Sequence, residues 1–593
     1  RIKAEKQVYF DNASSNWVQY ISKAYKYDAA GNLLKELDAL GYEAGTGTTM
    51  DAKIDSGYGA EYTYTPSNKV ETVTDSVSRE RFLPYTVKYT YDTAGRKRSE
   101  TDARGVIKSY IYDEDGNIEY VKVQEYAGSG EEVVQHNTYD YAGNMLTQTD
   151  GEGNTVTYQY NAFNKVRKAI YPYDSTVPQN VVTYQYDKMG NLASQQDTDG
   201  TLDIFTYDNV GRQLDHTQKK SSGTEVITTS FKYDKNGNVR YEYDGNRAKA
   251  TNTYDELNRL LTTSVTVAGV VQTNTNTYDR NSNLLTTTDW RGNTYTNVYD
   301  GLNRLIEKKD PYNKTVEKLE YNKNNAQVKS YDALNNMTEY VYDKNNRLVE
   351  TVDSQGNSTI QEYDDAGNIE AKTDGRGNTT IYEYDEFNRL AKVINSLMQE
   401  TVYTYDLNGN MLTQEDGEGN VTTYEYNAMN LSIKRIDHAG RQGTEGSYTY
   451  INSKVESYTY YANGLMHTKT DRNGNEITYV YDSHGRLKSE TCGSESISYT
   501  YDSNGNQLTV TNSEGTVTRT YDELGRVLTK NDPGIGTSTF AYDIISGVDA
   551  GFTKETSTDP KGNVTQKVFD RAGRLKYVIA DGKTTTYNYY DNG

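Results

Sequence analysis

Short segments of alternating apolar and polar residues run along the whole chain, each bounded by residues that favour turns. Thr380, Tyr382 and Tyr384 fall on one side of an extended segment, which is the period of two typical of a β-strand. Between such segments stand Asp, Asn and Gly, because Gly supplies positive φ without steric cost and Asp caps a turn through its carboxylate. The pattern predicts β-hairpins with turns at both ends, running antiparallel from start to finish.

The hairpin unit recurs at a fixed period. With Tyr-Asp and a few variants as anchors, 25 anchors from Tyr27 to Tyr590 make 24 intervals, and 13 of these are 21 residues long. The residues that mark the repeat are Tyr91, Asp92 and Gly95; Tyr363, Asp364 and Gly367; Tyr384 and Asp385; and Tyr521, Asp522 and Gly525. Such an array is quasi-one-dimensional, and each unit contacts mainly its neighbours.

The repeat predicts an all-β fold in which antiparallel β-hairpins coil into a large, hollow, spiral β-sheet shell. Two strands per unit make roughly 50 strands, which at about 4.8 Å spacing form a ribbon about 240 Å long. Strand twist and the size limit of open sheets force such a ribbon to coil. Wound at a diameter of about 60 Å, it would make little more than one turn and form an open ring.

We expect one continuous shell with four sections and three insertions. The sections are divergent N-terminal repeats at 1–90, a regular array at 91–427, an insertion at 428–459 and C-terminal repeats at 460–593. Longer intervals place insertions at 29–63, 123–138 and 428–459, where loops on a rigid array could carry recognition. The chain starts without methionine and stops inside a unit, so we expect a fragment of a longer polypeptide.

The tyrosines are expected to hold the sheet together. There are 58 Tyr but 9 Phe and 2 Trp, and the apolar fraction is 34%. Tyr-x-Tyr spacing places two rings on one face, where they could stack on rings of neighbouring strands. An aromatic ladder would then replace an aliphatic core. A sugar-stacking or ligand-binding role for the rings is the less favoured interpretation.

Composition removes several classes of function. Lys and Arg number 63 against 84 Asp and Glu, a net charge of −21, which argues against a nucleic-acid partner. No run of 18 apolar residues predicts a transmembrane helix, and the opening Arg1-Ile2-Lys3 shows no signal peptide. Cys492 is the single cysteine, so neither an intramolecular disulfide framework nor a cysteine-based zinc site is expected.

The recurring Tyr-Asp-x-x-Gly-(Asn/Arg) unit, as at Tyr91–Arg96 and Tyr521–Arg526, resembles the YD repeat of the RHS (rearrangement hot spot) superfamily. That family includes bacterial RHS and wall-associated polymorphic toxins, Tc toxin BC components and the animal teneurins. The resemblance implies a hollow β-shell that, in the bacterial toxins, encloses a C-terminal toxic cargo domain. It also implies an extracellular or cell-surface bacterial protein. The Asn-rich, acidic, cysteine-poor repeats are more similar to the Gram-positive wall-associated branch.

One departure from the family concerns release of the cargo. Bacterial RHS shells commonly end in an Asp-Pro-Ile-Gly-Leu segment that supports self-cleavage, and the nearest string here is Asp532-Pro533-Gly534-Ile535-Gly536. It lacks the Leu, and further repeats follow it. We therefore interpret this string as a Pro-Gly turn rather than as part of a protease.

The sequence offers only weak candidates for metal-binding or catalytic residues. Four strings mimic the start of a calcium loop. They begin at Asp113, Asp234, Asp471 and Asp502, and the candidate ligands among them are Asp113, Asp115, Asn117, Asp471, Asn473 and Asn475. The position of the bidentate Glu of an EF-hand is occupied by Gln124, Gly245, Asp482 and Ser513, and the strings coincide with repeat turns. The five histidines form no ligand pair. We expect no catalytic residue, no cofactor and no metal, and hence no enzyme.

Two functions remain open at this point. The first is a structural container that sequesters or presents its own C-terminal cargo domain. The second is an extracellular adhesin, a fibre, or a surface module that binds carbohydrate, cell wall or protein without cargo. Similar surface residues from unit to unit would favour the second, and an inner face distinct from the outer would favour the first.

Overall fold

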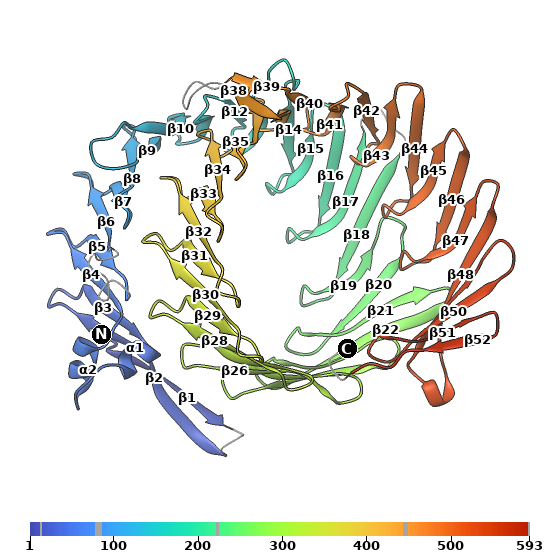
Figure 1. Ribbon diagram of the computed structural model, residues 1–593, viewed down its shortest axis with the longest axis horizontal. Helices are drawn as coiled ribbons and strands as arrows, with labels where there is room; N and C mark the ends of the chain where they lie inside the picture. The colour runs from blue at the N-terminus through green and yellow to red at the C-terminus, as the bar shows by residue number, and fades with distance from the viewer. Residues whose placement is uncertain (12–14, 77–85, 221–224, 443–448, 591–593) are drawn as a thin grey trace.

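The computed structural model describes residues 1–11, 15–76, 86–220, 225–442 and 449–590. One antiparallel sheet of 50 strands dominates the fold, and each strand pairs with its neighbours in sequence. Viewed down the short axis, the strands surround an open centre (Figure 1). The predicted all-β spiral sheet is therefore confirmed, and it does not close on itself.

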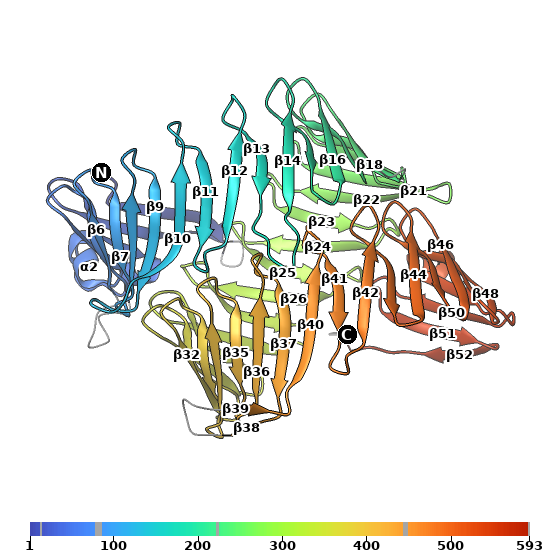
Figure 2. The same ribbon diagram turned by 90° about the horizontal axis from the view of Figure 1, so that it is seen from above.

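The spiral makes two coils, stacked one above the other (Figure 2). The first coil contains β1 (Ala4–Asp11), β2 (Asn16–Tyr27), β3 (Leu33–Asp38), β4 (Ala60–Tyr64), β5 (Val70–Thr74), β6 (Thr86–Tyr91), β7 (Lys97–Thr101), β8 (Ile107–Tyr112), β9 (Ile118–Gln124), β10 (Glu132–Tyr139), β11 (Met145–Asp150), β12 (Thr155–Tyr160), β13 (Val166–Ile170), β14 (Val181–Tyr186), β15 (Leu192–Gln196), β16 (Thr201–Tyr207), β17 (Gln213–Lys220), β18 (Val226–Tyr233), β19 (Val239–Tyr243), β20 (Lys249–Tyr254), β21 (Leu260–Val267), β22 (Val270–Tyr278), β23 (Leu284–Thr288), β24 (Thr294–Tyr299) and β25 (Leu305–Lys309).

The second coil continues without a break in the sheet. It contains β26 (Thr315–Tyr321), β27 (Gln327–Asp332), β28 (Met337–Tyr342), β29 (Leu348–Val352), β30 (Ser358–Tyr363), β31 (Ile369–Thr373), β32 (Thr379–Tyr384), β33 (Leu390–Ile394), β34 (Glu400–Tyr405), β35 (Met411–Glu415), β36 (Val421–Tyr426), β37 (Ser432–His438), β38 (Gly440–Gln442), β39 (Thr449–Ile451), β40 (Lys454–Tyr460), β41 (Met466–Thr470), β42 (Glu476–Tyr481), β43 (Leu487–Cys492), β44 (Glu495–Tyr501), β45 (Gln507–Asn512), β46 (Gly515–Tyr521), β47 (Val527–Asp532), β48 (Gly536–Ile544), β49 (Thr553–Thr558), β50 (Val564–Phe569), β51 (Leu575–Ala580) and β52 (Lys583–Thr586).

The expectation of little more than one turn is wrong. Hydrogen bonds join residues 254 to 303 positions apart along the contact between the coils, so one coil takes up roughly two dozen strands. At about 4.8 Å per strand, its perimeter is about 115 Å and its mean diameter about 40 Å. The 50 strands of the sheet agree with the predicted ribbon length. Each hairpin, however, bends the sheet more than a diameter of about 60 Å requires.

The expected insertions have different structures. Segment 29–63 holds the helices α1 (Ala39–Glu43) and α2 (Met50–Ser56), capped by Asp38 and Thr49. Segment 123–138 lengthens the β9–β10 hairpin, and 428–459 carries the separate two-stranded β38–β39 sheet. A 3₁₀ turn, η2 (Gly547–Asp549), interrupts the β48–β49 connection.

The shell has little conventional core. Most strand residues are half-buried, and among the described residues one cluster of buried apolar side chains forms, where Ile54 of α2 packs against Ala24 and Leu37 of the sheet. This follows from geometry, because a single curved sheet exposes both faces unless something covers one of them. The wall is therefore stabilised mainly by the backbone hydrogen bonds between strands and by the hydrogen bonds within the turns.

Candidate functional site: repeat turns and the seam between the coils

Each Tyr-Asp turn is organised by its aspartate. In the turn after β28, Asp343 Oδ1 accepts from the backbone N–H of Asn345 and of Arg347, each at 2.9 Å. Its Oδ2 accepts from Arg347 Nε at 2.7 Å. Asn346 takes φ +62°, the left-handed region that Asn tolerates and Gly occupies in most other units. We call these Tyr-Asp connections YD turns, and the connections at the opposite edge of the sheet return turns.

The repeat tyrosine bridges neighbouring hairpins. Between β29 and β30 the backbone pairing ends at Glu350 and Ile360, before it reaches the YD turns. There the hydroxyl of Tyr363 donates to the carbonyl oxygen of Leu348 at 2.7 Å. Equivalent bonds recur from Tyr64 to Tyr589. The hydroxyl thus replaces a backbone bond that is lost where adjacent hairpins splay apart.

The expected stacking of tyrosine on tyrosine is largely absent. Within the described ranges, tyrosine rings contact each other at Tyr25–Tyr27 and at Tyr461–Tyr481. Consecutive repeat tyrosines lie two strands apart, which is too far for direct stacking. In units whose preceding turn ends in arginine, the guanidinium covers the ring instead: Cζ of Arg347 lies 4.4 Å from the ring centroid of Tyr363, and Cζ of Arg526 lies 4.4 Å from that of Tyr542. In those units cation and ring alternate.

The structure places the marked repeat residues in these roles. Asp92 and Asp522 accept from the turn N–H groups and from Arg96 and Arg526. Gly95, Gly367 and Gly525 take positive φ. Tyr91, Tyr384 and Tyr521 donate to carbonyl oxygens of the preceding strand, and Asp364 and Asp385 cap their own turns.

The calcium-like strings are ordinary YD or return turns in geometry. Asp113 and Asp471 each accept from the backbone N–H and side-chain amide of the Asn four residues later, Asn117 or Asn475. These bonds lower the pKa of both aspartates, because they stabilise the charged form. Asp115 is exposed, and Asn473 donates its backbone N–H to Asp471.

The Asp532-Pro533 string forms the return turn between β47 and β48, where Gly534 takes φ +75°. The backbone N–H of Ile535 donates to the carbonyl oxygen of Asp532 at 3.2 Å. The next strand pairs directly with the preceding one through Asp532 and Gly536. The string is therefore part of the regular zigzag of the sheet.

Burial raises the pKa of many tyrosines, and neighbouring carboxylates add to this rise at many of them. The pKa of Tyr499 rises to about 12 through burial and through its hydrogen bond to Glu490, and that of Tyr458 rises to about 12 through burial and Glu456. A tyrosine whose pKa is higher in the folded than in the unfolded protein stabilises the fold. This stabilisation is complete at pH values below the unfolded pKa near 10, and it is lost as the pH rises through the pKa of the folded state.

We therefore expect those tyrosines whose pKa is raised by burial, such as Tyr458 and Tyr499, to ionise above pH 10 in the native protein, together with alkaline unfolding of the sheet. Absorbance at 295 nm, followed beside circular dichroism, measures both events. The protein in concentrated urea is the control and should titrate near pH 10. Native and denatured protein titrating alike would contradict the bridging role of the hydroxyls.

A seam joins the return turns of the first coil to the YD turns of the second. Asn408 Nδ2 donates to Asp150 Oδ2 at 2.6 Å, and Asn408 Oδ1 accepts from the backbone N–H of Gly151 at 3.0 Å. This two-bond clasp recurs with Asn324 on Asp38 and Leu40, Asn345 on Asp75 and Ser76, and Asn504 on Asp244 and Asn246. The asparagine is always the third residue after the repeat tyrosine.

The two coils approach closely at these clasps. A Cβ at Gly151 would lie 2.6 Å from Leu407 Cβ, and a Cβ at Gly245 would lie 2.3 Å from the carbonyl oxygen of Ser503. Glycine is therefore needed there for space. Elsewhere the seam uses other pairs, such as Arg104 with Asp385 and Asn388.

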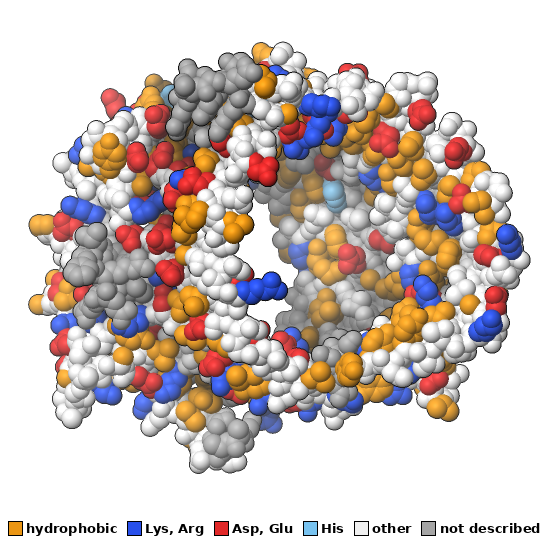
Figure 3. Space-filling view, in the orientation of Figure 1, with side chains coloured by type: hydrophobic (Ala, Val, Ile, Leu, Met, Phe, Trp, Pro, Cys, Tyr) orange, Lys and Arg blue, Asp and Glu red, His pale blue; other side chains and the backbone are white. Residues whose placement is uncertain are grey.

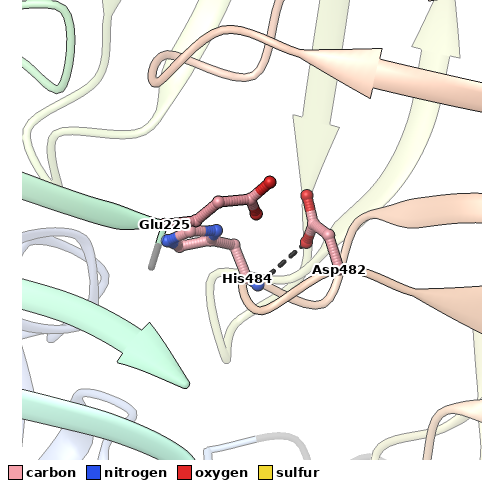
Figure 4. Close-up of side chains that lie close together, drawn as sticks. All are labelled: Glu225, Asp482 and His484. Atoms are coloured by element: carbon pink, nitrogen blue, oxygen red, sulfur yellow. Dashed lines mark hydrogen bonds between the residues drawn. The ribbon is translucent and has the colours of Figure 1, made fainter. Parts of the chain in front are cut away.

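One seam contact gathers possible metal ligands. Glu225 from the first coil lies near Asp482 and His484 of the second, with ligand atoms within 4.8 Å of one another (Figure 4). Their hydrogen-bonding groups are already used, because Asp482 accepts from Arg486 and from the N–H of His484. His484 Nε2 lies 3.3 Å from the carbonyl oxygen of Gln218. The arrangement holds the coils together through its own hydrogen bonds.

The coils enclose a hollow. Figure 3 shows the opening along the shell axis, with apolar, acidic and basic side chains interspersed on the visible wall. Among the described residues, no helix is long and apolar enough to cross a bilayer. The molecule's main spatial feature is therefore a two-coil wall, stitched edge to edge, around an open centre.

Comparison with known proteins agrees with this architecture. The sequence model of the RHS Repeat family matches residues 139–176, 342–379, 363–397, 460–496 and 501–537, whereas no curated protein matches the sequence. The crystal structure of TcdB2-TccC3 has TM-score 0.69 and 13% identity, covering 97% of this chain and 35% of that chain. A structure of the Photorhabdus luminescens Tc holotoxin pore has TM-score 0.57 and 13% identity, covering 97% and 33%. The chain thus spans about a third of the solved chains that share its fold.

Proposed function

We propose that this RHS-repeat chain is a wall segment of a secreted or surface-delivered bacterial toxin, and that its shell encloses or presents a C-terminal cargo domain of the same polypeptide. One observation carries the proposal: the two coils are clasped edge to edge around an open centre. An extended sheet that served only as a binding surface would have no need of a clasped second coil.

The wall acts physically rather than chemically in this proposal. Its turn aspartates, seam asparagines and bridging tyrosines are occupied by hydrogen bonds that hold the sheet, so we assign no catalytic role to them. Cargo inside the wall would be kept from proteases and from the producing cell until delivery. We place the protein outside the cell or on its surface, with a Gram-positive source as the preferred case.

Protection of the cargo tests the proposal. In the complete gene product, the segment that follows this chain should resist proteinase K for as long as the shell is intact. Asn408→Asp combined with Asn504→Asp, which opens the seam, should expose that segment and speed its cleavage by about tenfold or more. Mass spectrometry of the fragments measures both rates.

Asn236→Asp is the matched control, because Asn236 holds the same repeat position away from the seam. Cleavage of the following segment at the same rate in wild type and in the opened variant would contradict the container. That result would favour the runner-up, a surface adhesin, fibre or module that binds glycan, cell wall or protein without cargo.

A further inference from the structure

Two clasps of the seam contain the dipeptide Asn-Gly. They are Asn408-Gly409 and Asn504-Gly505. The side-chain carbon Cγ of an asparagine can be attacked by the backbone nitrogen of the next residue, and glycine permits this most readily because it has no side chain and the widest range of backbone angles. Both glycines are exposed, so water reaches the dipeptide. Bonds across the seam are thus made by asparagines whose sequence favours deamidation.

The closed clasp holds the Asn408 amide away from this reaction. Its Nδ2 donates to Asp150 Oδ2 at 2.6 Å and to Asn430 Oδ1 at 2.9 Å, and its Oδ1 accepts from the N–H of Gly151 at 3.0 Å. The attacking group is engaged as well, since the N–H of Gly409 donates to a carbonyl oxygen of its own turn at 3.1 Å. Cyclisation requires the side chain to leave its three bonds, so it follows a local opening of the clasp.

Asn504 is restrained in the same way. Its Nδ2 donates to Asp244 Oδ2 at 2.7 Å, and its Oδ1 accepts from the N–H of Asn246 at 3.1 Å. The N–H of Gly505 donates to the carbonyl oxygen of Asp502 at 3.2 Å. At both clasps the amide that would be lost is held by the other coil, and the attacking nitrogen is held by its own turn.

We propose that Asn408 and Asn504 are sites of spontaneous deamidation, that the closed clasps suppress the reaction, and that the reaction prevents an opened clasp from closing again. The backbone nitrogen of Gly409 bonds to Cγ of Asn408 and loses its proton, and the side-chain nitrogen leaves as ammonia. Water then opens the cyclic succinimide at either carbonyl, which leaves aspartate or isoaspartate at position 408. Either product carries a carboxylate at neutral pH, and this faces the Asp150 carboxylate where a donor stood. The inference concerns the seam and does not depend on the proposed container function.

Two glycines allow each clasp to be opened without changing its Asn-Gly dipeptide. A Cβ at Gly151 would lie 2.6 Å from Leu407 Cβ, and a Cβ at Gly245 would lie 2.3 Å from the carbonyl oxygen of Ser503. Gly151→Ala should therefore force the coils apart at the Asn408 clasp, and Gly245→Ala should do so at the Asn504 clasp. Each variant leaves the other clasp intact and serves as its control.

Peptide mass spectrometry of the folded 593-residue chain, incubated in mildly alkaline buffer, measures the deamidation rate at each asparagine. Gly151→Ala should speed the reaction of Asn408 at least about tenfold and leave Asn504 at its wild-type rate, and Gly245→Ala should do the reverse. In urea both asparagines of the wild type should react fast. Hydrogen exchange at Gly151 should be faster in aged protein that is modified at Asn408 than in fresh protein, because the clasp no longer closes.

Other positions separate this chemistry from crowding and from general unfolding. Gly417→Ala introduces a similar clash, 2.7 Å from Gln399 Cβ, within one coil, and should change neither rate. The clasp residues Asn324 and Asn345 are each followed by asparagine and should react more slowly than Asn408 in urea.

Three results would overturn the proposal. The first is an Asn408 that reacts equally fast in native and in urea-unfolded wild type, since the clasp would then give no protection. The second is a Gly151→Ala variant that speeds neither asparagine or both alike, because the effect would then not come from one clasp. The third is unchanged hydrogen exchange at Gly151 after modification, which would mean that the clasp closes again.

Discussion

Replacing Asn408 by Asp is expected to open the seam between the coils. The change removes the donor to Asp150 and places two carboxylates where a 2.6 Å hydrogen bond now lies. Repulsion between them, together with the loss of the hydrogen bonds that Asn408 Nδ2 donates to Asp150 and to Asn430 Oδ1, should destabilise the local contact by about 2–4 kcal/mol. Hydrogen exchange measured by mass spectrometry should show faster exchange in the return turn at Gly151 and in the YD turn after β34.

Asn236→Asp provides a close comparison for this substitution. Asn236 is also the third residue after a repeat tyrosine, and its amide donates to Asn258 of the next turn on the same edge at 3.2 Å. Its replacement should change stability by about 0.5 kcal/mol or less, as is usual for surface positions. Equal effects of the two substitutions would show that the clasps do not hold the coils together.

Replacing Asp522 by Ala is expected to disrupt the repeat turn and the adjoining cation–ring contact together. Asp522 accepts from the N–H groups of Leu524 and Arg526 and from the Arg526 guanidinium, and its side chain is 4% exposed. Without the carboxylate, Arg526 loses the partner that holds it over Tyr542. We expect a local cost of about 3 kcal/mol, seen as faster exchange from β46 to β48.

Asp115→Ala separates this effect from a general loss of acidic charge. Asp115 lies in a YD turn but is exposed, and its backbone N–H remains after the substitution. The free energy of unfolding of the Asp115→Ala variant should differ from that of the wild type by about 0.5 kcal/mol or less. If Asp115→Ala and Asp522→Ala lowered the free energy of unfolding equally, the hydrogen bonds of the turn aspartate would not be what stabilises the wall.

Because each unit contacts mainly its neighbours, both disruptions should stay local before they spread. A repeat array loses stability as a sum of unit and interface terms. The seam changes this, since a clasp ties residues more than 250 positions apart. Opening one clasp should therefore weaken the wall in two coils at once, whereas opening one turn should weaken it at a single place.

Sequence reasoning predicted the hairpins, the turns and the coiled sheet because the signals are local. A YD turn is closed by bonds that span four residues, as between Asp343 and Arg347, so its geometry depends on the residues between them. The same reasoning predicted a structural role for the tyrosines, but it expected each ring to stack on another tyrosine ring. The arginine was visible five residues after the tyrosine of the preceding unit, but its distance to the next ring depends on strand pairing.

The sequence by itself determined the repeat, the strand direction and the residues that close each turn, because these depend on contacts within one hairpin. Only the tertiary structure decided how many strands make a coil, since a small curvature per hairpin accumulates over roughly two dozen strands. The accumulated curvature determines which turns of the two coils face each other across the seam. Asn236 and Asn408 occupy the same repeat position and both link to the next turn along their edge, and coil geometry alone adds to Asn408 the clasp across the seam.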